Sequence, residues 1–256
     1  MRTKLVFFLA SSVVAVALRA ADLPSALTIA LADGRAYATA HPPKIGRFEP
    51  DIAKMLEAEK ADPVAPGKIL FIGSSIFRLW TTVREDLAPL PVRNRAFGGS
   101  RTSDVLERFD QLVKPLAPKV IVYYCGSNDI NGGESATAIF ARVQAFLEKL
   151  HAGAPDTRFV FVSIIRAPEK RARWVEVDRV NRLVRELCSV EPHCRFVDVN
   201  PAVFGADGEP RMDFYKEDKL HYFPPAYVAF TKIVKPAIAA AWAEIAGDIA
   251  APHRVP

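Results

Sequence analysis

The chain has 256 residues, half of them hydrophobic and a quarter charged, which is an ordinary composition for a globular protein with one full core. Its 34 basic and 29 acidic residues give a formal net charge of +5, but three of the basic residues lie within positions 1–20. Without that segment 31 bases stand against 29 acids, a charge of +2. No sustained basic face remains, so we expect no nucleic-acid partner.

Residues 1–20 have the organisation of an export signal. Arg2 and Lys4 precede an uncharged apolar run from Leu5 to Leu18, and small residues follow from Ala20 onward. The run is shorter than the ~20 residues that cross a bilayer. We expect a signal peptide cleaved after Ala20, and therefore a periplasmic or secreted protein without stable membrane insertion. Cleavage after Ala17 and a retained anchor are the alternatives.

The next segment, residues 21–47, contains Pro24, Asp33-Gly34 and Pro42-Pro43, which predict an irregular arm. Residues 48–250 then alternate between two patterns. Apolar residues at helical spacing predict helices over residues 48–61, 77–83, 102–113, 135–151, 174–188 and 226–245. Short β-branched and aromatic runs predict strands over residues 68–72, 92–97, 120–125, 159–165 and 196–199. Apolar strands that alternate with helices indicate a three-layer α/β/α sandwich around a five-stranded parallel sheet.

Three motifs follow three of these strands: Gly73-Ser74-Ser75, Gly98-Gly99-Ser100 and Gly126-Ser127-Asn128-Asp129. Ligands of open α/β sheets bind at the carboxyl ends of the strands, where these motifs lie. Ser75 stands where a strand turns into a helix, a position that suits either a nucleophile or a helix N-cap. The neighbouring Ser74 is a competing nucleophile.

Gly99 and Asn128 are candidate donors to a developing oxyanion. Paired glycines let the backbone approach a ligand and present a bare N–H, although an ordinary turn also explains them. An asparagine at a strand end can aim its amide at the oxyanion or form an Asx-turn. The alternatives remain open for both residues.

Asp218 and His221 precede the last predicted helix and are separated by two residues. On a turn, that spacing lets the carboxylate reach one imidazole nitrogen while the other faces a serine. A solvated surface pair is the alternative. Together the four segments supply the nucleophile, base, carboxylate and donors that serine acyl transfer needs.

These residues resemble the SGNH (GDSL) hydrolase family, in its platelet-activating-factor-acetylhydrolase-like branch of esterases. The resemblance covers residues 48–238 and is carried by residues 69–80, 94–100, 124–129 and 218–221. It implies a flavodoxin-like SGNH hydrolase fold for residues 48–250, with Ser75 as nucleophile, His221 as base and Asp218 orienting it. It also implies an oxyanion hole from the N–H groups of Ser75 and Gly99 and the Asn128 side chain, without any cofactor.

The chain departs from the family at three positions. Ser74 stands where an aspartate usually precedes the nucleophile, Ala96 replaces a common glycine, and Lys219 stands where a glycine is frequent. None of these changes removes a catalytic group, so we expect an active serine esterase.

No long insertion separates the nucleophile from the Asp218–His221 pair. We therefore expect a shallow site that prefers short acyl groups such as acetyl, on a small-molecule or glycan ester. Arg101 and Arg166 lie near strand ends and are candidate substrate contacts, or else ordinary solvated charges. The alternatives are a lysophospholipase or thioesterase on the same site, and a non-catalytic envelope binding protein with a fossil site.

The cysteines suggest one disulfide. Cys188 and Cys194 flank a short loop, and in an oxidising compartment we expect them to be bonded. Zinc held by these two cysteines and His193 is the alternative, but only three donors are present, so we expect no metal. Cys125 ends an apolar strand, and we expect a buried free thiol there.

Overall fold

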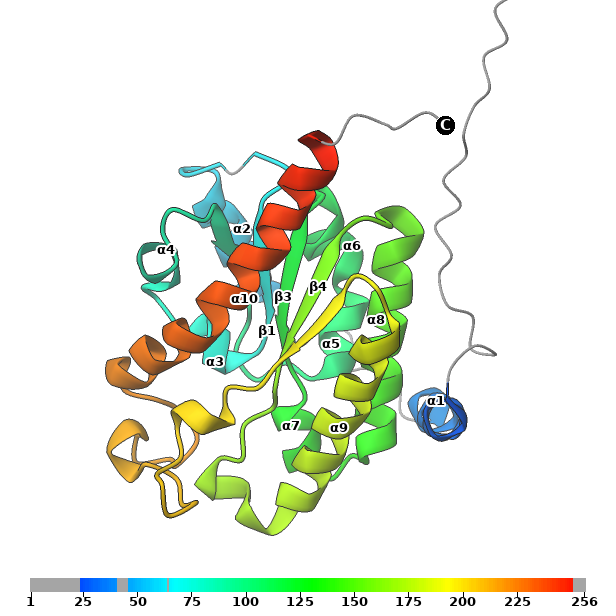
Figure 1. Ribbon diagram of the computed structural model, residues 1–256, viewed down its shortest axis with the longest axis vertical. Coiled ribbons are helices and arrows are strands. Elements are labelled where there is room, and N and C mark those ends of the chain that lie inside the picture. The colour runs from blue at the N-terminus through cyan, green and yellow to red at the C-terminus, as the bar shows by residue number, and fades with distance from the viewer. Residues whose placement is uncertain (1–23, 41–45, 64, 251–256) are drawn as a thin grey trace, which may run out of the picture.

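The computed structural model describes residues 24–40, 46–63 and 65–250, so the predicted signal peptide at residues 1–20 lies outside the described residues. Five parallel strands form one sheet in the order β2-β1-β3-β4-β5 (Figure 1). The strands are β1 Ile69–Gly73, β2 Val92–Asn94, β3 Val120–Tyr124, β4 Arg158–Val162 and β5 Cys194–Val197. The strand order changes direction between β1 and β3, which is where ligands bind in sheets of this kind.

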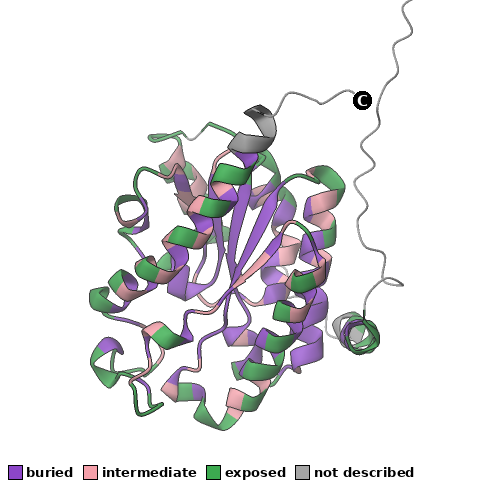
Figure 2. Ribbon diagram, viewed as in Figure 1, coloured by how far each residue is buried: buried purple, intermediate pink, exposed green. Residues whose placement is uncertain are grey.

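Helices cover both faces of the sheet, and the strands between them are largely buried (Figure 2). One apolar core lies under α1 Ser25–Ala40, α2 Glu49–Glu59, α5 Thr102–Glu107, α6 Phe109–Leu112, α8 Ala136–Gly153 and α9 Trp174–Val190. The other lies under α3 Ser75–Arg78, α4 Val83–Asp86 and α10 Pro224–Ala250. The predicted three-layer α/β/α sandwich with a five-stranded parallel sheet is therefore confirmed.

The strand β3 shows why the sequence reads as one continuous apolar run. Ile121 and Tyr123 belong to the first core, whereas Val122 and Tyr124 belong to the second. Successive side chains of a strand point to opposite faces, and here both faces are covered by helices. Every residue of the strand therefore loses contact with water.

The prediction of an irregular arm over residues 21–47 is wrong for residues 25–40, which form the helix α1. Leu27 and Leu31 are buried in the first core, and α1 packs against α8. A Cβ atom at Gly34 would lie only 2.1 Å from the carbonyl oxygen of Thr137 in α8. Gly34 therefore permits close contact between two helices, and the Asp33-Gly34 pair does not mark a turn.

Two predicted helices are divided in the structure. The segment 77–83 becomes α3 and α4, and the segment 102–113 becomes α5, α6 and a 3-10 turn at Lys114–Leu116. Arg108, between α5 and α6, has a ψ angle of 9° and so leaves the helical conformation. The short helix α7 at Ser127–Asn131 follows β3. Further 3-10 turns occupy Pro168–Arg173, Asn200–Ala202 and Met212–Phe214.

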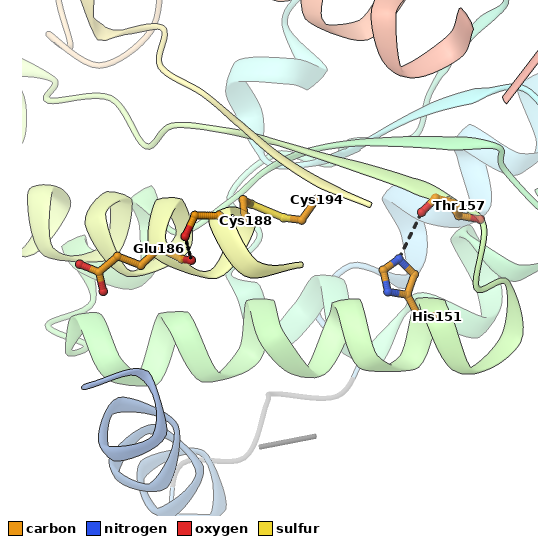
Figure 3. Close-up of a disulfide and its surroundings, with 6 residues drawn as sticks. His151, Thr157, Glu186, Cys188 and Cys194 are labelled. Atoms are coloured by element: carbon orange, nitrogen blue, oxygen red, sulfur yellow. Dashed lines mark hydrogen bonds between the residues drawn. A yellow bond between two sulfur atoms is a disulfide. The ribbon is translucent and has the colours of Figure 1, made fainter. Parts of the chain in front are cut away.

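A disulfide joins Cys188, near the end of α9, to Cys194, the first residue of β5 (Figure 3). The bonded sulfurs leave no thiolate at these positions for zinc. Cys125 is a free, buried cysteine, and burial raises the pKa of its thiol. Among the described residues, no helix has the length and apolar character needed to cross a membrane.

Candidate active site

Ser75, His221 and Asp218 form a continuous hydrogen-bonded chain at the carboxyl end of the sheet. The Ser75 Oγ lies 2.8 Å from His221 Nε2, and His221 Nδ1 lies 2.6 Å from Asp218 Oδ2. Ser75 begins α3 immediately beyond β1, and only 8% of it is exposed. The three residues that the sequence assigned to one reaction are therefore in direct contact.

The turn around Asp218 holds this carboxylate and fixes the imidazole tautomer. Its Oδ1 atom accepts hydrogen bonds from the backbone N–H groups of Leu220 at 3.0 Å and His221 at 2.9 Å. Burial opposes ionisation, but these bonds and the one from the imidazole outweigh it and lower the pKa of Asp218 to about 2. An ionised carboxylate only accepts, so Nδ1 carries the proton and Nε2 accepts from Ser75.

The backbone at the end of β1 selects Ser75 over Ser74. The Ser74 side chain is buried, and its Oγ atom has no hydrogen-bond partner among the described residues. Gly73 has a φ of +140°, and a Cβ atom there would lie 1.8 Å from the carbonyl oxygen of Tyr124. The glycine therefore lets β1 turn tightly against β3, which brings Ser75 to the edge of the sheet.

Ser100 connects the loops that carry the two other candidate donors. Its hydroxyl donates to the carbonyl oxygens of Gly73 at 3.1 Å and Phe97 at 3.0 Å. Its carbonyl accepts from the Asn128 amide at 2.9 Å. Gly99 has a φ of +77°, which glycine adopts without strain. Ser100 thus ties the loop after β2 to the end of β1 through its hydroxyl and to α7 through its carbonyl.

Gly99 and Asn128 line the same pocket as Ser75 and His221, and its volume is about 720 Å³. Part of its wall comes from α2, which contributes Asp51, Lys54, Met55 and Ala58. The remaining lining residues are Arg78, Asn94, Ala96, Phe97, Gly98 and Leu220. The sequence predicted a helix over residues 48–61 but gave no sign that it borders the reacting serine.

A buried polar cluster lies next to the loops that carry the candidate oxyanion donors Gly99 and Asn128. The carboxylate of Asp129 accepts from the backbone N–H of Thr102 at 3.0 Å and from its hydroxyl. Arg142 contacts Asp129 at 3.4 Å and also pairs with Glu134. Burial raises the pKa of Asp129 to about 6, with the Glu134 charge adding to the shift and the Thr102 hydrogen bonds opposing it. The cluster fixes the start of α5, and with it the Gly99–Ser100 loop, against α7.

The structure corrects the expected substrate contacts. Arg101 turns toward Glu134, with 3.2 Å between their side chains, and Arg166 lies 3.1 Å from a carboxylate oxygen of Asp178. Neither arginine lines the pocket. Both arginines lie near strand ends as expected, but each pairs with a nearby carboxylate.

The cations that do line the pocket are Arg78 and Lys54. Arg78 follows Ser75 by three residues on α3, so helical spacing alone indicates that the two lie on one face. No signal of that kind was available for Lys54, because its place depends on how α2 packs onto the sheet.

Comparison with known proteins identifies the family of the chain and finds solved structures with the same fold. The sequence pattern of the GDSL-like Lipase/Acylhydrolase family matches residues 73–228. A comparison with curated proteins finds no match.

Solved structures of similar fold cover most of the chain. A Streptococcus pneumonia protein, provisionally described as a platelet activating factor, is 21% identical with a TM-score of 0.66, over 84% of this chain and 99% of that one. A GDSL-like lipase from Bacteroides thetaiotaomicron is 22% identical with a TM-score of 0.58, over 73% and 97%. An acetyl-xylooligosaccharide esterase from Geobacillus Stearmophilus is 15% identical with a TM-score of 0.55, over 66% and 93%. The chain belongs to the GDSL-like lipase/acylhydrolase family and is a hydrolase that acts on ester bonds.

Proposed function

We propose that this protein is a serine esterase that cleaves carboxylic esters of short acyl groups through an acyl-enzyme. One observation carries the proposal: Ser75 Oγ lies 2.8 Å from His221 Nε2, while His221 Nδ1 lies 2.6 Å from Asp218 Oδ2. A nucleophile, a base and an orienting carboxylate in contact are the requirements for activating a serine hydroxyl.

The geometry suggests the following sequence of steps. Ser75 Oγ attacks the ester carbonyl carbon while His221 Nε2 takes the hydroxyl proton, and the ionised Asp218 stabilises the imidazolium. His221 then returns the proton to the departing alkoxide. Water, activated by the same imidazole, attacks the acyl-enzyme and releases the carboxylic acid and free Ser75.

Three groups are proposed to stabilise the oxyanion: the N–H of Ser75, the N–H of Gly99 and the Asn128 amide. The Asn128 amide carries two hydrogens, and its 2.9 Å bond to the Ser100 carbonyl uses one. The other remains for the oxyanion. Because this bond holds the amide in place before substrate arrives, little reorganisation accompanies the reaction.

The pocket lining favours a small, polar substrate. Its lining includes the polar groups of Asn94, Asn128, Lys54 and Arg78, and does not form one long apolar channel. Two of the proteins with similar structures are named as an acetyl esterase and an acetyl-xylooligosaccharide esterase. We therefore propose acetyl or another short acyl group, with a glycan as one candidate alcohol.

Substitution of the two adjacent serines tests the nucleophile. Ser75→Ala removes the attacking hydroxyl, so hydrolysis of an acetyl ester should fall by about 10³-fold or more. Ser74→Ala is the matched control and should retain much of the activity, because the Ser74 hydroxyl does not contact His221. Labelling with a fluorophosphonate should likewise require Ser75 alone. Equal losses in the two variants would refute the assignment.

A panel of esters tests the acyl preference. Acetyl esters should react fastest and the rate should fall as the acyl chain lengthens. Equal or faster turnover of long-chain esters, lysophospholipids or thioesters would replace the proposed substrate class with one of those alternatives.

We also propose that the protein is exported. The charged and apolar pattern of residues 1–20 and the Cys188–Cys194 disulfide, which suits an oxidising compartment, both support export. The mass of the protein recovered from outside the cytoplasm should correspond to a chain that begins at Ala21. A full-length cytoplasmic chain would contradict this proposal.

A further inference from the structure

Two cations line the pocket that contains Ser75 and His221, and neither has a carboxylate partner. They are Lys54 of α2 and Arg78 of α3, both exposed. In the described part of the chain, no carboxylate lies within ion-pair distance of either side chain. Several other arginines of the described residues do pair with carboxylates.

Arg84, Arg95 and Arg101 each pair with a carboxylate, of Asp62, Glu59 and Glu134 respectively. Unpaired guanidinium and ammonium groups beside a reacting centre are therefore available to a ligand.

Arg78 lies beside the loop that carries the proposed oxyanion donor. A Cβ atom at Gly98 would lie 2.6 Å from the Arg78 Nε atom and 3.1 Å from its Nη2 atom. The absence of a side chain at Gly98 leaves this space to the guanidinium in the structure. The planar, always charged group therefore lies directly against the Gly98-Gly99 backbone, one helical turn beyond Ser75.

Lys54 is held near the pocket by the way α2 is anchored. Ile52 is fully buried, and the ring of Phe48 packs edge-on against Phe97, with 5.0 Å between the ring centres. At the other end of the helix, Glu59 forms a buried ion pair with Arg95 at 2.6 Å. These contacts position a helix that precedes the family-matched region 73–228. Lys54 therefore reaches the wall of the site from a helix that lies outside the residues matched by the family pattern.

The charge around the pocket is positive. Asp51 is the one acidic residue that lines it, and Asp218 is already engaged with His221. A third cation, Arg47, lies beside the pocket, with its Nη2 atom 3.5 Å from the position of a Cβ atom on Gly99. An anionic group entering this space would meet more positive than negative charge.

We infer that the pocket selects esters whose alcohol portion carries an anionic group, which Arg78 and Lys54 bind. The inference rests on the proposed esterase function, since it concerns the substrate of the same site. The anion is assigned to the alcohol because a short acyl group fills little of a pocket of about 720 Å³. Carboxylate and phosphate oxygens share the chemistry that Arg78 recognises, because both match its forked donors.

The test compares paired substrates in matched variants. The probes are 4-acetoxybenzoate, 4-acetoxyphenyl phosphate and the neutral methyl 4-acetoxybenzoate. The variants are Arg78→Ala and Lys54→Ala, with Arg179→Ala and Lys232→Ala as controls that remove an exposed cation outside the pocket. The readout is kcat/KM for each anionic ester divided by kcat/KM for the neutral ester. Differences in leaving-group reactivity cancel when each variant is compared with the wild-type protein.

Each pocket variant should lower this ratio by about fivefold or more at low ionic strength, and added salt should shrink the effect. The controls should leave the ratio at its wild-type value. A drop for 4-acetoxybenzoate alone identifies a carboxylate as the anion, and a drop for 4-acetoxyphenyl phosphate alone identifies a phosphate. Both results support the inference.

Two outcomes would overturn it. If the ratio is the same in all variants while Ser75→Ala remains inactive, the esterase proposal stands and the anion site does not exist. If instead the pocket variants lower kcat/KM for monophenyl succinate, which carries an anion on its acyl group, relative to neutral phenyl butyrate, the assignment to the alcohol is wrong. A wild-type protein that hydrolyses none of these esters would remove the proposed function itself, and this inference with it.

Discussion

Two parts of the pocket are held in place in different ways. The reacting corner contains Ser75, Asp218 and His221, and the α2 wall contains Asp51, Lys54, Met55 and Ala58. Ser75, Asp218 and His221 are joined by short side-chain hydrogen bonds, and the Asp218 carboxylate also accepts from the backbone of its own turn. The helix α2 instead relies on apolar packing and on an ion pair at its end. The first region lies within residues 73–228, which the family shares, whereas α2 precedes them.

This difference separates the residues that react with the ester from those that contact the rest of the substrate. The reacting groups depend on hydrogen-bond geometry, which leaves short, recognisable motifs in the sequence. The α2 wall depends on packing between distant segments, and its exposed positions can change without disturbing Ser75. Substitutions in the reacting corner should therefore act on turnover, and substitutions that loosen α2 should act on substrate binding.

Among the substitutions that test this comparison, Asp218→Asn should have the largest effect. The amide no longer fixes the Nδ1–H tautomer of His221 or stabilises the imidazolium, so kcat should fall by about 10²- to 10⁴-fold while KM changes little. Steady-state kinetics on an acetyl ester measures this. Asp213→Asn, a neighbouring exposed carboxylate paired with Arg211, is the control and should keep wild-type kcat. Loss of kcat in both variants would mean that the loop, not the carboxylate–imidazole contact, matters.

The pH profile of the wild-type protein sharpens that prediction. The folded pKa of Asp218 is about 2, below the usual value for aspartate, so ionised Asp218 stabilises the folded state above that usual value. This contribution is lost only as the pH falls toward 2. The free energy of unfolding of the wild-type protein should therefore fall between the usual aspartate value and about pH 2, and Asp218→Asn should remove that part of the pH dependence. An Asp218→Asn variant that loses as much stability as the wild-type protein over this pH range would contradict the assignment.

A smaller effect, on binding, is expected from Glu59→Gln. Arg95 is almost fully buried, and the substitution leaves its charge with a neutral partner, which should lower the free energy of unfolding by about 1–3 kcal/mol. Because α2 then holds its place less firmly, KM should rise several-fold with a smaller change in kcat. Glu57→Gln on the same helix is the control, since Glu57 pairs with Lys60 at the surface. A change in kcat alone would break the division between the two regions.

The disulfide lies outside both regions and should affect stability alone. Replacing Cys188 and Cys194 together by serine opens a loop of six residues' separation, which should lower the free energy of unfolding by about 2 kcal/mol in the chain-entropy account. Both kcat and KM should stay near their wild-type values. Denaturant titration measures the stability, and thiol counting on denatured, unreduced wild-type protein should find Cys125 only. Three free thiols would exclude the bond.

The sequence predicted those features of the fold and site that depend on local signals in the chain. The strands were recognisable because β3 and β4 are buried on both faces, so that β3 has no charged residue and β4 is apolar from Phe159 to Val162. The contact between Ser75 and His221 was predictable because both lie in short motifs that resemble those of the SGNH (GDSL) hydrolase family. Both kinds of signal are local in the chain.

The misses depend on contacts between distant segments. Asp33-Gly34 resembles a turn until Thr137 of α8 is seen to occupy the space beside Gly34. Arg101 resembles a substrate contact until Glu134, far along the chain, is seen to bind it. Lys54 shows no sign of lying beside Ser75 until α2 is placed on the sheet. A single sequence does not reveal which remote residue fills a given space.

The smallest effect, on stability, is expected at Lys219, where the sequence motif and the backbone conformation both bear on the prediction. It stands where the family often has glycine, and in the structure its φ is +54°, a left-handed conformation that strains a residue with a Cβ atom. Lys219→Gly should relieve this strain, but glycine also makes the unfolded chain more flexible, so the gain in stability should not exceed about 1 kcal/mol. Lys219→Ala keeps the Cβ atom and is the control. Thermal unfolding of the two variants should therefore place the glycine variant above the alanine variant, with the contact between Asp218 and His221, and hence kcat, preserved in both. An alanine variant as stable as the glycine variant would show that the turn does not strain its side chain.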